Sequence, residues 1–453
     1  MNKNIFRAYD IRGNANSDLD SNTVTKIGYV LGKRIIRNGH HSVYIGFDSR
    51  LSAQKIFKAL SKGFNIANVK VLNIGLVPTP LVYYATKIGN TPNGVMITGS
   101  HNPKDDNGLK MVINDNAVSG IDLLDEVKNV IDLGGNIPNV EHIDIVTRYL
   151  DEVSKTIQIT KPMKVVLDSG NGAAGEVAHQ IFNSIGIETY SIYKEPDGNF
   201  PNHHPDPSKE KNLTDLKKAV LELNADVGFA FDGDGDRVGM ITNDGQSVLA
   251  DHLIMLLSRF YLQQKKGSIV FDVKCSNQLP KLITDHGGTP IMEKTGHFNI
   301  KRTIKEKQAI LGGEMSGHIF INHDWYGFDD AIFTAAILAK IIAQSKNTAS
   351  EIIREFPRTF STPELNLEVE DSNKFEMVEK FINEMSFPES DLNTIDGVRV
   401  TIGSAWGLMR ASNTSPKLVF RFEAETDEEL LQIKNLFEEN LSRIFPDLSL
   451  NFN

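Results

Sequence analysis

The stretch GVMITGSHNPKDDNGLKMVI, residues 94–113, places a short polar loop between two apolar runs. Residues 94–97 and 109–113 are apolar and partly β-branched over the length of a strand, so both are predicted strands. Ser100 therefore lies on a loop between strands, where Pro103 prevents the chain from continuing as a helix. A hydrogen-bonded turn serine is the ordinary alternative. Because of the chemical loops that follow further along the chain, we interpret Ser100 as a nucleophile that carries a phosphoryl group.

Strands and helices alternate on both sides of this loop. Apolar residues at helical spacing predict helices near residues 27–35 and 56–64, and the apolar runs 43–47 and 71–74 predict strands. The alternation continues to about residue 145. It predicts an α/β domain in which loops, including that of Ser100, gather beyond the carboxyl ends of the strands.

Two further α/β units and a different final unit follow. A strand and a glycine-rich turn begin near Lys164, and another helix and strand occupy residues 251–273. Beyond Pro357, runs in which apolar and polar residues alternate predict an antiparallel sheet with one solvent-exposed face. A helix is predicted near residues 428–443. We therefore expect an α/β fold of four domains, three similar mixed-sheet α/β domains and a smaller C-terminal α+β domain around a central cleft. Their expected boundaries, for domains 1 to 4, are 1–145, 146–247, 248–357 and 358–453.

Composition limits the partners. The formal net charge of −10 argues against nonspecific binding of nucleic acid, but it leaves room for an anionic small ligand in a local basic pocket. A single cysteine, Cys275, excludes an internal disulfide and favours a reducing compartment. The longest apolar tract, residues 331–343, contains Lys340 and is too short to cross a bilayer. We expect a cytoplasmic monomer that needs neither nucleic acid nor a membrane.

A second chemical loop, Asp-Gly-Asp-Gly-Asp-Arg at residues 232–237, joins the predicted strands 227–231 and 238–242. Its glycines let the chain fold tightly, so the three aspartates can converge. Converging carboxylates repel one another unless a cation holds them, and hard oxygen ligands suit Mg²⁺. An EF-hand is excluded because its sixth position would be Arg237 and its twelfth Asn243. A solvated acidic turn is the alternative.

Two other patterns have plain structural alternatives. Residues 170–175 match the spacing G-x-G-x-x-G of a dinucleotide-binding turn, but the acidic residue expected further on, Glu195, lies in a Pro/Gly-rich stretch. A plain glycine-rich turn from strand to helix is therefore favoured over dinucleotide binding. The adjacent His203 and His204 point different ways in an extended loop, so an ordered loop is favoured over a metal pair.

Two later loops carry polar groups suited to sugars and phosphates. In residues 313–318, Gly-Glu-Met-Ser-Gly-His, the side chains of Glu314, Ser316 and His318 alternate. In an extended loop they face one side and offer a carboxylate, a hydroxyl and an imidazole to sugar hydroxyls; a structural histidine is the alternative for His318. In residues 410–416, Arg-Ala-Ser-Asn-Thr-Ser-Pro combines a guanidinium with neutral donors, which favours a phosphate cradle over a polar hairpin turn.

In this order, TGSHNP (98–103), DGDGDR (232–237), GEMSGH (313–318) and RASNTSP (410–416) resemble the α-D-phosphohexomutase family over the whole chain, most closely its bacterial phosphomannomutase/phosphoglucomutase group. The resemblance implies an intramolecular phosphotransferase of the isomerase class, which interconverts hexose 1-phosphate and hexose 6-phosphate of mannose, glucose or both. It implies a phosphorylated serine, with a hexose 1,6-bisphosphate as intermediate and activator. It also implies one Mg²⁺ held by Ser100, Asp232, Asp234 and Asp236.

The same resemblance implies roles for further residues. The substrate-binding residues implied by it are Tyr9, Arg237, Lys274, Glu314, Ser316, His318, Arg410, Ser412, Asn413 and Thr414. Proton transfer near the serine needs a base, and the sequence leaves four candidates open. These candidates for the catalytic base are Arg12, His101, Lys110 and His297.

Three rivals share parts of this pattern. A phosphoglucosamine mutase would use the same machinery on an amino sugar, but Met315 and Asn413 stand where that group usually carries Gln and Gly. A non-catalytic phosphosugar-binding protein is expected to lose Ser100 or an aspartate, and all are present. A phosphatase would hydrolyse the same phosphoserine, and water exclusion by domain closure separates it from a mutase.

Overall fold

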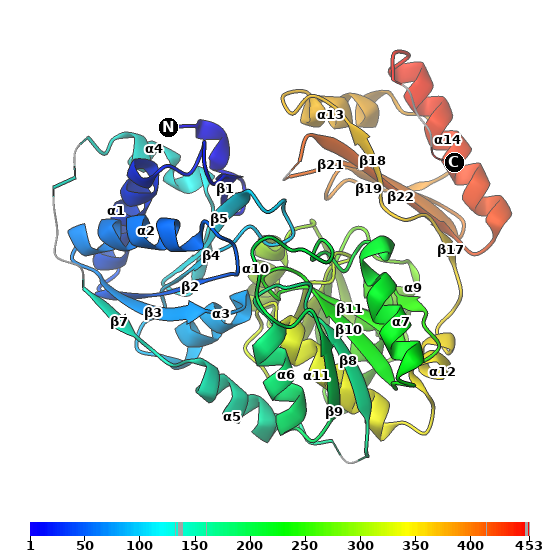
Figure 1. The fold of residues 1–453 in the computed structure, drawn as a ribbon. Helices are drawn as coiled ribbons and strands as arrows, with labels where there is room; N and C mark the ends of the chain where they lie inside the picture. Colours follow the sequence, from blue (N-terminus) through cyan, green and yellow to red (C-terminus); the bar gives the residue numbers. More distant parts are fainter. Residues whose placement is uncertain (132, 135–138, 160, 414, 449–451, 453) are drawn as a thin grey trace.

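Four β-sheets follow one another along the chain in the computed structural model (Figure 1). The N-terminal sheet, in blue and cyan, lies beside two sheets drawn mainly in green, and the C-terminal sheet, in orange, forms a separate body with the red helix α14 (Asp427–Ile444). The expected α/β architecture with a smaller C-terminal domain is confirmed. Every helix among the described residues is too short or too polar to cross a membrane. The structure describes residues 1–453 except 132, 135–138, 160, 414, 449–451 and 453.

The first sheet is mixed, with the order β1-β5-β4-β2-β3-β7 and β6 paired with β5. Its strands are β1 (Ile11–Asn14), β2 (Ser42–Phe47), β3 (Lys70–Leu76), β4 (Gly94–Ile97), β5 (Asp106–Ile113), β6 (Asn116–Val118) and β7 (Val140–His142). Its helices are α1 (Ser21–Arg37), α2 (Ala53–Ile66), α3 (Thr79–Ile88) and α4 (Leu124–Lys128). Strand β4 runs parallel to β2 and antiparallel to β5, so the turn that carries Ser100 lies at the carboxyl end of a parallel pair.

The second and third sheets repeat this plan with fewer strands, in the orders β12-β11-β10-β8-β9 and β14-β13-β15-β16. Domain 2 contains α5 (Val146–Thr156), β8 (Lys164–Asp168), α6 (Gly175–Ser184), β9 (Glu188–Ile192), α7 (Thr214–Glu222), β10 (Val227–Phe231), β11 (Val238–Thr242) and β12 (Ser247–Val248). Domain 3 contains α8 (Ala250–Gln264), β13 (Ser268–Asp272), α9 (Gln278–Asp285), β14 (Thr289–Glu293), α10 (His297–Lys307), β15 (Leu311–Gly313), β16 (Ile319–Ile321), α11 (Ala331–Gln344) and α12 (Ala349–Arg354).

One position recurs in the three α/β domains. In each, a strand that is parallel to its inner neighbour turns back as an antiparallel hairpin: β4 to β5, β10 to β11 and β15 to β16. The chemical loops around Ser100, Asp232 and Glu314 are these three hairpin turns. Ligands of α/β sheets bind beyond the carboxyl ends of the strands, so the repeated topology brings three different loops to equivalent functional positions.

The fourth domain is built around a six-stranded sheet with the order β17-β22-β21-β20-β19 and with β18 paired to β22. All its pairings are antiparallel, as predicted. Its elements are β17 (Phe360–Ser361), β18 (Leu365–Glu368), α13 (Lys374–Glu384), β19 (Asp391–Asn393), β20 (Val398–Ile402), β21 (Ala405–Ala411), β22 (Lys417–Ala424) and α14. Arg410 lies at the end of β21, at the turn to β22.

A continuous hydrophobic core joins domains 2 and 3 to helix α3 of domain 1. Within it, Tyr84 stacks on Trp325 with ring centroids 5.8 Å apart, and Tyr149 Oη donates to Asp330 at 2.9 Å. Domain 4 packs around a core of its own. The first three loops therefore share one packed support. The Arg410 loop is carried by a domain with its own core, which meets domain 3 through a small buried cluster of Val273, Trp406 and Leu408.

Candidate active site

Ser100 is almost fully buried in the turn between β4 and β5. Its backbone has a left-handed φ of +50°, a conformation that is strained for a residue with a side chain. Its hydroxyl donates a hydrogen bond to Asp232 Oδ2 at 2.8 Å and lies 3.1 Å from His101 Nδ1. The turn thus presents Ser100 Oγ to the aspartate loop of domain 2, and the first two predicted loops meet.

The three aspartates of the second loop converge as predicted. The loop folds back on itself, because the backbone N–H groups of Asp236 and Arg237 donate to Asp232 Oδ1 at 3.1 and 3.2 Å. One carboxylate oxygen from each of Asp232, Asp234 and Asp236 lies within 4.8 Å of the others, and all three residues are buried. Carboxylates held this close form a strongly negative point inside the protein.

Two of these aspartates have one oxygen engaged and one that accepts no hydrogen bond from the described residues. Lys110 Nζ lies 2.6 Å from Asp234 Oδ2 and contacts Asp236 Oδ2, and the Thr79 hydroxyl also donates to Asp234 Oδ2. The Oδ1 atoms of Asp234 and Asp236 are buried and accept no hydrogen bond from the described residues. Unpartnered buried carboxylate oxygens are the donors that a hard divalent cation takes. The residues present therefore fit Mg²⁺.

Burial and neighbouring charges set the protonation of this cluster. Burial, reinforced by the Asp234 and Asp236 carboxylates, raises the pKa of Asp232 well above its ordinary value. Burial alone would lower the pKa of Lys110, but the same two carboxylates outweigh it and hold that pKa well above its ordinary value. Lys110 therefore keeps its proton at neutral pH and is a fixed positive charge of the site.

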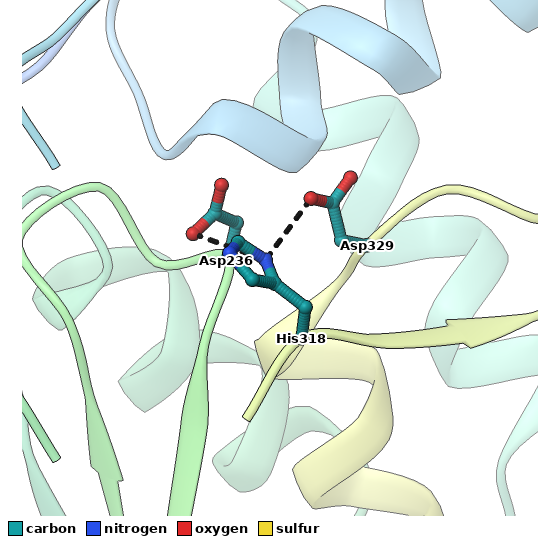
Figure 2. A group of neighbouring side chains, drawn as sticks. All are labelled: Asp236, His318 and Asp329. Atoms are coloured by element: carbon teal, nitrogen blue, oxygen red, sulfur yellow. Dashed lines mark ion pairs between the residues drawn. The ribbon is translucent and has the colours of Figure 1, made fainter. Parts of the chain in front are cut away.

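Asp236 also belongs to a second group, with His318 and Asp329 (Figure 2). His318 Nδ1 lies 3.1 Å from Asp329 Oδ2 and 3.6 Å from Asp236 Oδ1. On its other side, His318 Nε2 accepts a hydrogen bond from Arg237 Nε at 3.0 Å. Because a neutral imidazole that accepts at Nε2 carries its proton on Nδ1, the atom facing the two carboxylates is a donor and not a metal ligand. This group therefore orients Arg237 and His318.

The loop around Glu314 is a tight turn, and the extended conformation predicted for it is wrong. Gly317 N donates to Glu314 O at 3.0 Å, and Glu314 N donates to His318 O at 2.9 Å. Because the chain reverses there, alternate residues do not share a face. Ser316 Oγ lies 3.5 Å from Glu314 Oε2, whereas His318 turns toward the group in Figure 2. Burial raises the pKa of Glu314.

Lys274 and Arg410 bring positive charge from domains 3 and 4. Lys274 Nζ pairs with Glu364 Oε2 at 3.0 Å and lies 3.8 Å from Asp272 Oδ2. Arg410 Nε donates to Asp396 at 2.8 Å, while its buried Nη2 has no hydrogen-bond partner among the described residues. A held guanidinium with a spare donor is suited to gripping a phosphate.

The rest of the domain 4 loop reaches toward domain 1. The Ser412 hydroxyl accepts a hydrogen bond from Ser415 N at 3.2 Å. The Asn413 amide donates to the hydroxyl of Tyr9, which joins the two domains. Burial raises the pKa of Tyr9 to about 12, so its hydroxyl stays protonated at neutral pH. Thr414 lies outside the described residues.

The four candidates for the catalytic base have different surroundings. Arg12 pairs with Asp10 at 2.6 Å, and Lys110 is held by two carboxylates. Burial and nearby cations hold the pKa values of His101 and His297 well below their ordinary range, so both imidazoles are neutral at neutral pH. The two groups able to accept a proton are therefore histidines.

Four models of one protein family match most of the chain. Family models described as phosphoglucomutase/phosphomannomutase α/β/α domains I, II and III and C-terminal domain match residues 3–134, 147–245, 250–360 and 364–439. The chain belongs to this family. A phosphomannomutase/phosphoglucomutase of Pseudomonas putida is 46% identical over 99% of this chain and 97% of that protein. A phosphoglucomutase of Neisseria meningitidis is 39% identical over 98% of this chain and 99% of that protein.

A solved structure agrees with these relatives. The crystal structure of a phosphoglucomutase/phosphomannomutase family protein from Burkholderia thailandensis has a TM-score of 0.93 and 38% sequence identity, with 100% of both chains covered. This phosphoglucomutase/phosphomannomutase family member is therefore a mutase of the isomerase class, and its reaction is the interconversion of hexose phosphates.

The glycine-rich turn at residues 170–175 and the adjacent His203 and His204 both have a structural role beside the site. In the glycine-rich turn, Ala173 N donates to Gly233 O at 3.0 Å, and a Cβ atom on Gly172 would lie 2.8 Å from that oxygen. The turn thus packs against the aspartate loop. His203 pairs with Asp168 at 3.0 Å, and His204 Nε2 hydrogen-bonds to the carbonyl of His101. The histidines hold different partners, as expected of an ordered loop.

Three residues that contact the site were not predicted from the sequence. Arg50 binds the backbone of the Ser100 turn, Thr79 binds Asp234, and Asp329 faces His318. For Arg50 a signal existed, because it follows β2 at the sheet edge where the Ser100 turn lies. Thr79 carried no signal, because packing between domains 1 and 2 brings it to Asp234. Asp329 carried none either, because it meets His318 only once domain 3 has folded.

Proposed function

We propose that the chain interconverts the 1- and 6-phosphates of glucose and mannose through a phosphoserine at Ser100. The observation that carries this proposal is the hydrogen bond of 2.8 Å from Ser100 Oγ to Asp232 Oδ2, which sets a nucleophile against a buried carboxylate cluster. Phosphoryl transfer depends mainly on positioning and on stabilisation of charge, and a hydroxyl beside a cation site supplies both. The names of the Pseudomonas relatives support both sugars.

The cation is expected to be one Mg²⁺, held by Asp232, Asp234 and Asp236 together with the phosphate on Ser100. Bound there, it would neutralise phosphate oxygens and stabilise the charge that develops during transfer. The protein supports the site by engaging the other oxygens of Asp234 and Asp236 with Lys110. The Oδ1 atoms of the two aspartates, which are buried and accept no hydrogen bond from the described residues, support this assignment.

The proposed cycle moves one phosphoryl group in each direction. The free hydroxyl of a hexose monophosphate attacks the phosphorus on Ser100, a new P–O bond forms, the bond to Ser100 Oγ breaks, and the hydroxyl proton passes to a base. The resulting hexose 1,6-bisphosphate reorients in the site, so that its other phosphate faces Ser100 and is transferred to it. Added bisphosphate phosphorylates a dephosphorylated serine, so it is the expected activator.

A sugar that binds in two orientations needs groups that tolerate both. We propose that Glu314 and Ser316 contact ring hydroxyls, because the carboxylate and hydroxyl lie side by side. The remote phosphate is expected to bind the basic and neutral donors contributed by domains 3 and 4, namely Lys274, Arg410, Ser412, Asn413 and Thr414. Tyr9, Arg237 and His318 complete the proposed substrate site.

Proton transfer is assigned to a histidine in this proposal. Arg12 is paired with Asp10, and Lys110 is engaged with two carboxylates. His101 lies 3.1 Å from Ser100 Oγ, whereas His297 approaches the site from the start of α10. Both remain candidates, and two different positions of the sugar can use different bases.

Arg410→Ala is expected to weaken binding of glucose 1-phosphate by about 1 to 3 kcal/mol, the range for charge-assisted hydrogen bonds. The reason is the loss of the guanidinium whose Nη2 is buried without a partner. The measurement is isothermal titration calorimetry, with KM as a second readout. Arg443→Ala, which removes a guanidinium from the far helix α14, serves as the control and keeps wild-type affinity. Unchanged affinity in Arg410→Ala would show that domain 4 does not grip the phosphate.

The proposed specificity is tested with glucose 1-phosphate, mannose 1-phosphate and glucosamine 1-phosphate in parallel, each with Mg²⁺ and a trace of glucose 1,6-bisphosphate. Comparable turnover of the first two substrates and little of the third is expected. Preference for the amino sugar would leave the phosphoserine mechanism intact and reassign the substrate. Release of free phosphate without isomerisation would identify a phosphatase and contradict the proposal.

We further propose that the protein acts as a cytoplasmic monomer. Support for the monomer is that the residues of the site come from all four domains of one chain. A single buried cysteine supports a reducing compartment. We propose the domain boundaries predicted from the sequence, with one change. The boundary between domains 2 and 3 is placed after Val248, because β12 ends at Val248 and pairs with β11.

A further inference from the structure

We propose that Arg50 is a positioning residue for phosphoryl transfer, whose guanidinium holds Ser100 in the left-handed conformation that directs Oγ at Asp232. The inference rests on the proposed role of Ser100 as the nucleophile. It deepens that proposal by naming the group that maintains the strained turn. Arg50 itself is placed behind the turn, where it touches backbone and not the reacting atoms.

The guanidinium of Arg50 binds four carbonyl groups of a single turn. Nη2 donates to Ser100 O at 2.8 Å and to Asn102 O at 2.7 Å. Nη1 donates to Asp106 O at 2.7 Å and also to Pro103 O. The Arg50 side chain is 0% exposed. A guanidinium offers five N–H donors in a rigid fork, so one side chain can define the path of a whole turn.

A second set of contacts fixes the other end of the Ser100 peptide. Asp48 Oδ2 accepts from Arg50 Nε at 3.2 Å and from the Thr98 hydroxyl at 2.6 Å. The Thr98 oxygen in turn accepts from Ser100 N at 2.8 Å. Both the N–H and the C=O of Ser100 are therefore tied to the end of β2. A strained backbone conformation persists only where its surroundings determine it in this way.

Close packing shows that the guanidinium lies flat against the turn. A Cβ atom on Gly99 would lie 2.5 Å from Arg50 Cζ and 2.6 Å from its Nε. Phe200, from the domain 2 loop, covers Arg50 with its ring centroid 5.5 Å from Cζ. Gly99 therefore leaves the space that the guanidinium fills. An alanine at position 99 would displace the guanidinium without removing either Arg50 or Asp48.

The test uses Arg50→Lys and Gly99→Ala, which disturb the same contact from its two sides. Lysine keeps the positive charge but, as a single ammonium group, cannot span four carbonyls. In both variants kcat for glucose 1-phosphate is expected to fall about 10²-fold, the cost of a misplacement of about 1 Å at a reacting group, with KM close to wild type. Arg34→Lys is the control, because Arg34 also binds a carbonyl group, that of Asp122, at a distant edge of domain 1.

The outcomes separate this inference from the proposed function. Circular dichroism and thermal unfolding establish that each variant is folded, and where Arg50→Lys does not fold, Gly99→Ala decides. If a folded variant has wild-type kcat while Ser100→Ala is inactive, the positioning role of Arg50 is overturned and the proposed function stands. Activity in Ser100→Ala overturns the proposed function and this inference with it. A loss of kcat at constant KM in both variants, with Arg34→Lys unchanged, supports the positioning role.

Discussion

Replacement of Ser100 by alanine is expected to abolish mutase activity, with a fall in kcat of about 10⁶-fold, the size seen when another enzyme loses its nucleophile. The variant has no oxygen that can carry the phosphoryl group between the two positions of the sugar. Binding of glucose 1,6-bisphosphate is expected to remain, because Glu314 and Arg410 lie on other loops. A coupled assay measures turnover, and isothermal titration calorimetry measures binding of the bisphosphate.

Ser61→Ala is the matched control for this experiment. Ser61 is also a buried serine of domain 1, but its hydroxyl lies in helix α2 and has no hydrogen-bond partner among the described residues. It is expected to retain wild-type kcat. Substantial mutase activity in Ser100→Ala would show that the phosphoryl group does not pass through this serine, whatever the fate of the control.

The strands that carry the chemical loops were predictable from the sequence. Apolar runs of strand length, bounded by glycine or charged residues, leave few alternatives, and 94–97, 227–231 and 238–242 coincide with β4, β10 and β11. Helix α14, from Asp427 to Ile444, also lies within one residue of its predicted bounds. The convergence of the aspartates was predictable because repulsion among close carboxylates makes their spacing unusual without a cation.

Contacts between residues far apart in the chain could not be predicted in this way. Thr79 and Asp234 are 155 residues apart, and Asn413 and Tyr9 are 404 residues apart. Periodicity describes which face of an element is buried, but it contains no information on which domains pack together. The predicted conformation of the Glu314 loop was wrong for a local reason. The hairpin from β15 to β16 reverses the chain, so the side chains do not alternate as they would in an extended strand.

Asp234→Asn is expected to remove the metal dependence of the enzyme and to lower kcat about 10³-fold, equivalent to about 4 kcal/mol of transition-state stabilisation. Asparagine keeps the shape of the side chain and an oxygen that can accept from the Thr79 hydroxyl. It removes one negative charge and one unpartnered carboxylate oxygen from the cluster. The measurements are kcat as a function of Mg²⁺ concentration and the change in melting temperature when Mg²⁺ is added.

The melting temperature tests the metal site independently of turnover. A cation that binds the native state alone stabilises it in proportion to the logarithm of its concentration over Kd, so added Mg²⁺ is expected to raise the melting temperature of the wild type and not that of Asp234→Asn. Asp244→Asn is the control, because Asp244 lies in the next turn, bonded to Thr242, and is expected to keep the full shift. If Asp234→Asn lost activity but kept the Mg²⁺ shift, the aspartate would be needed to hold Lys110 and not the cation, since Lys110 is its other charged partner.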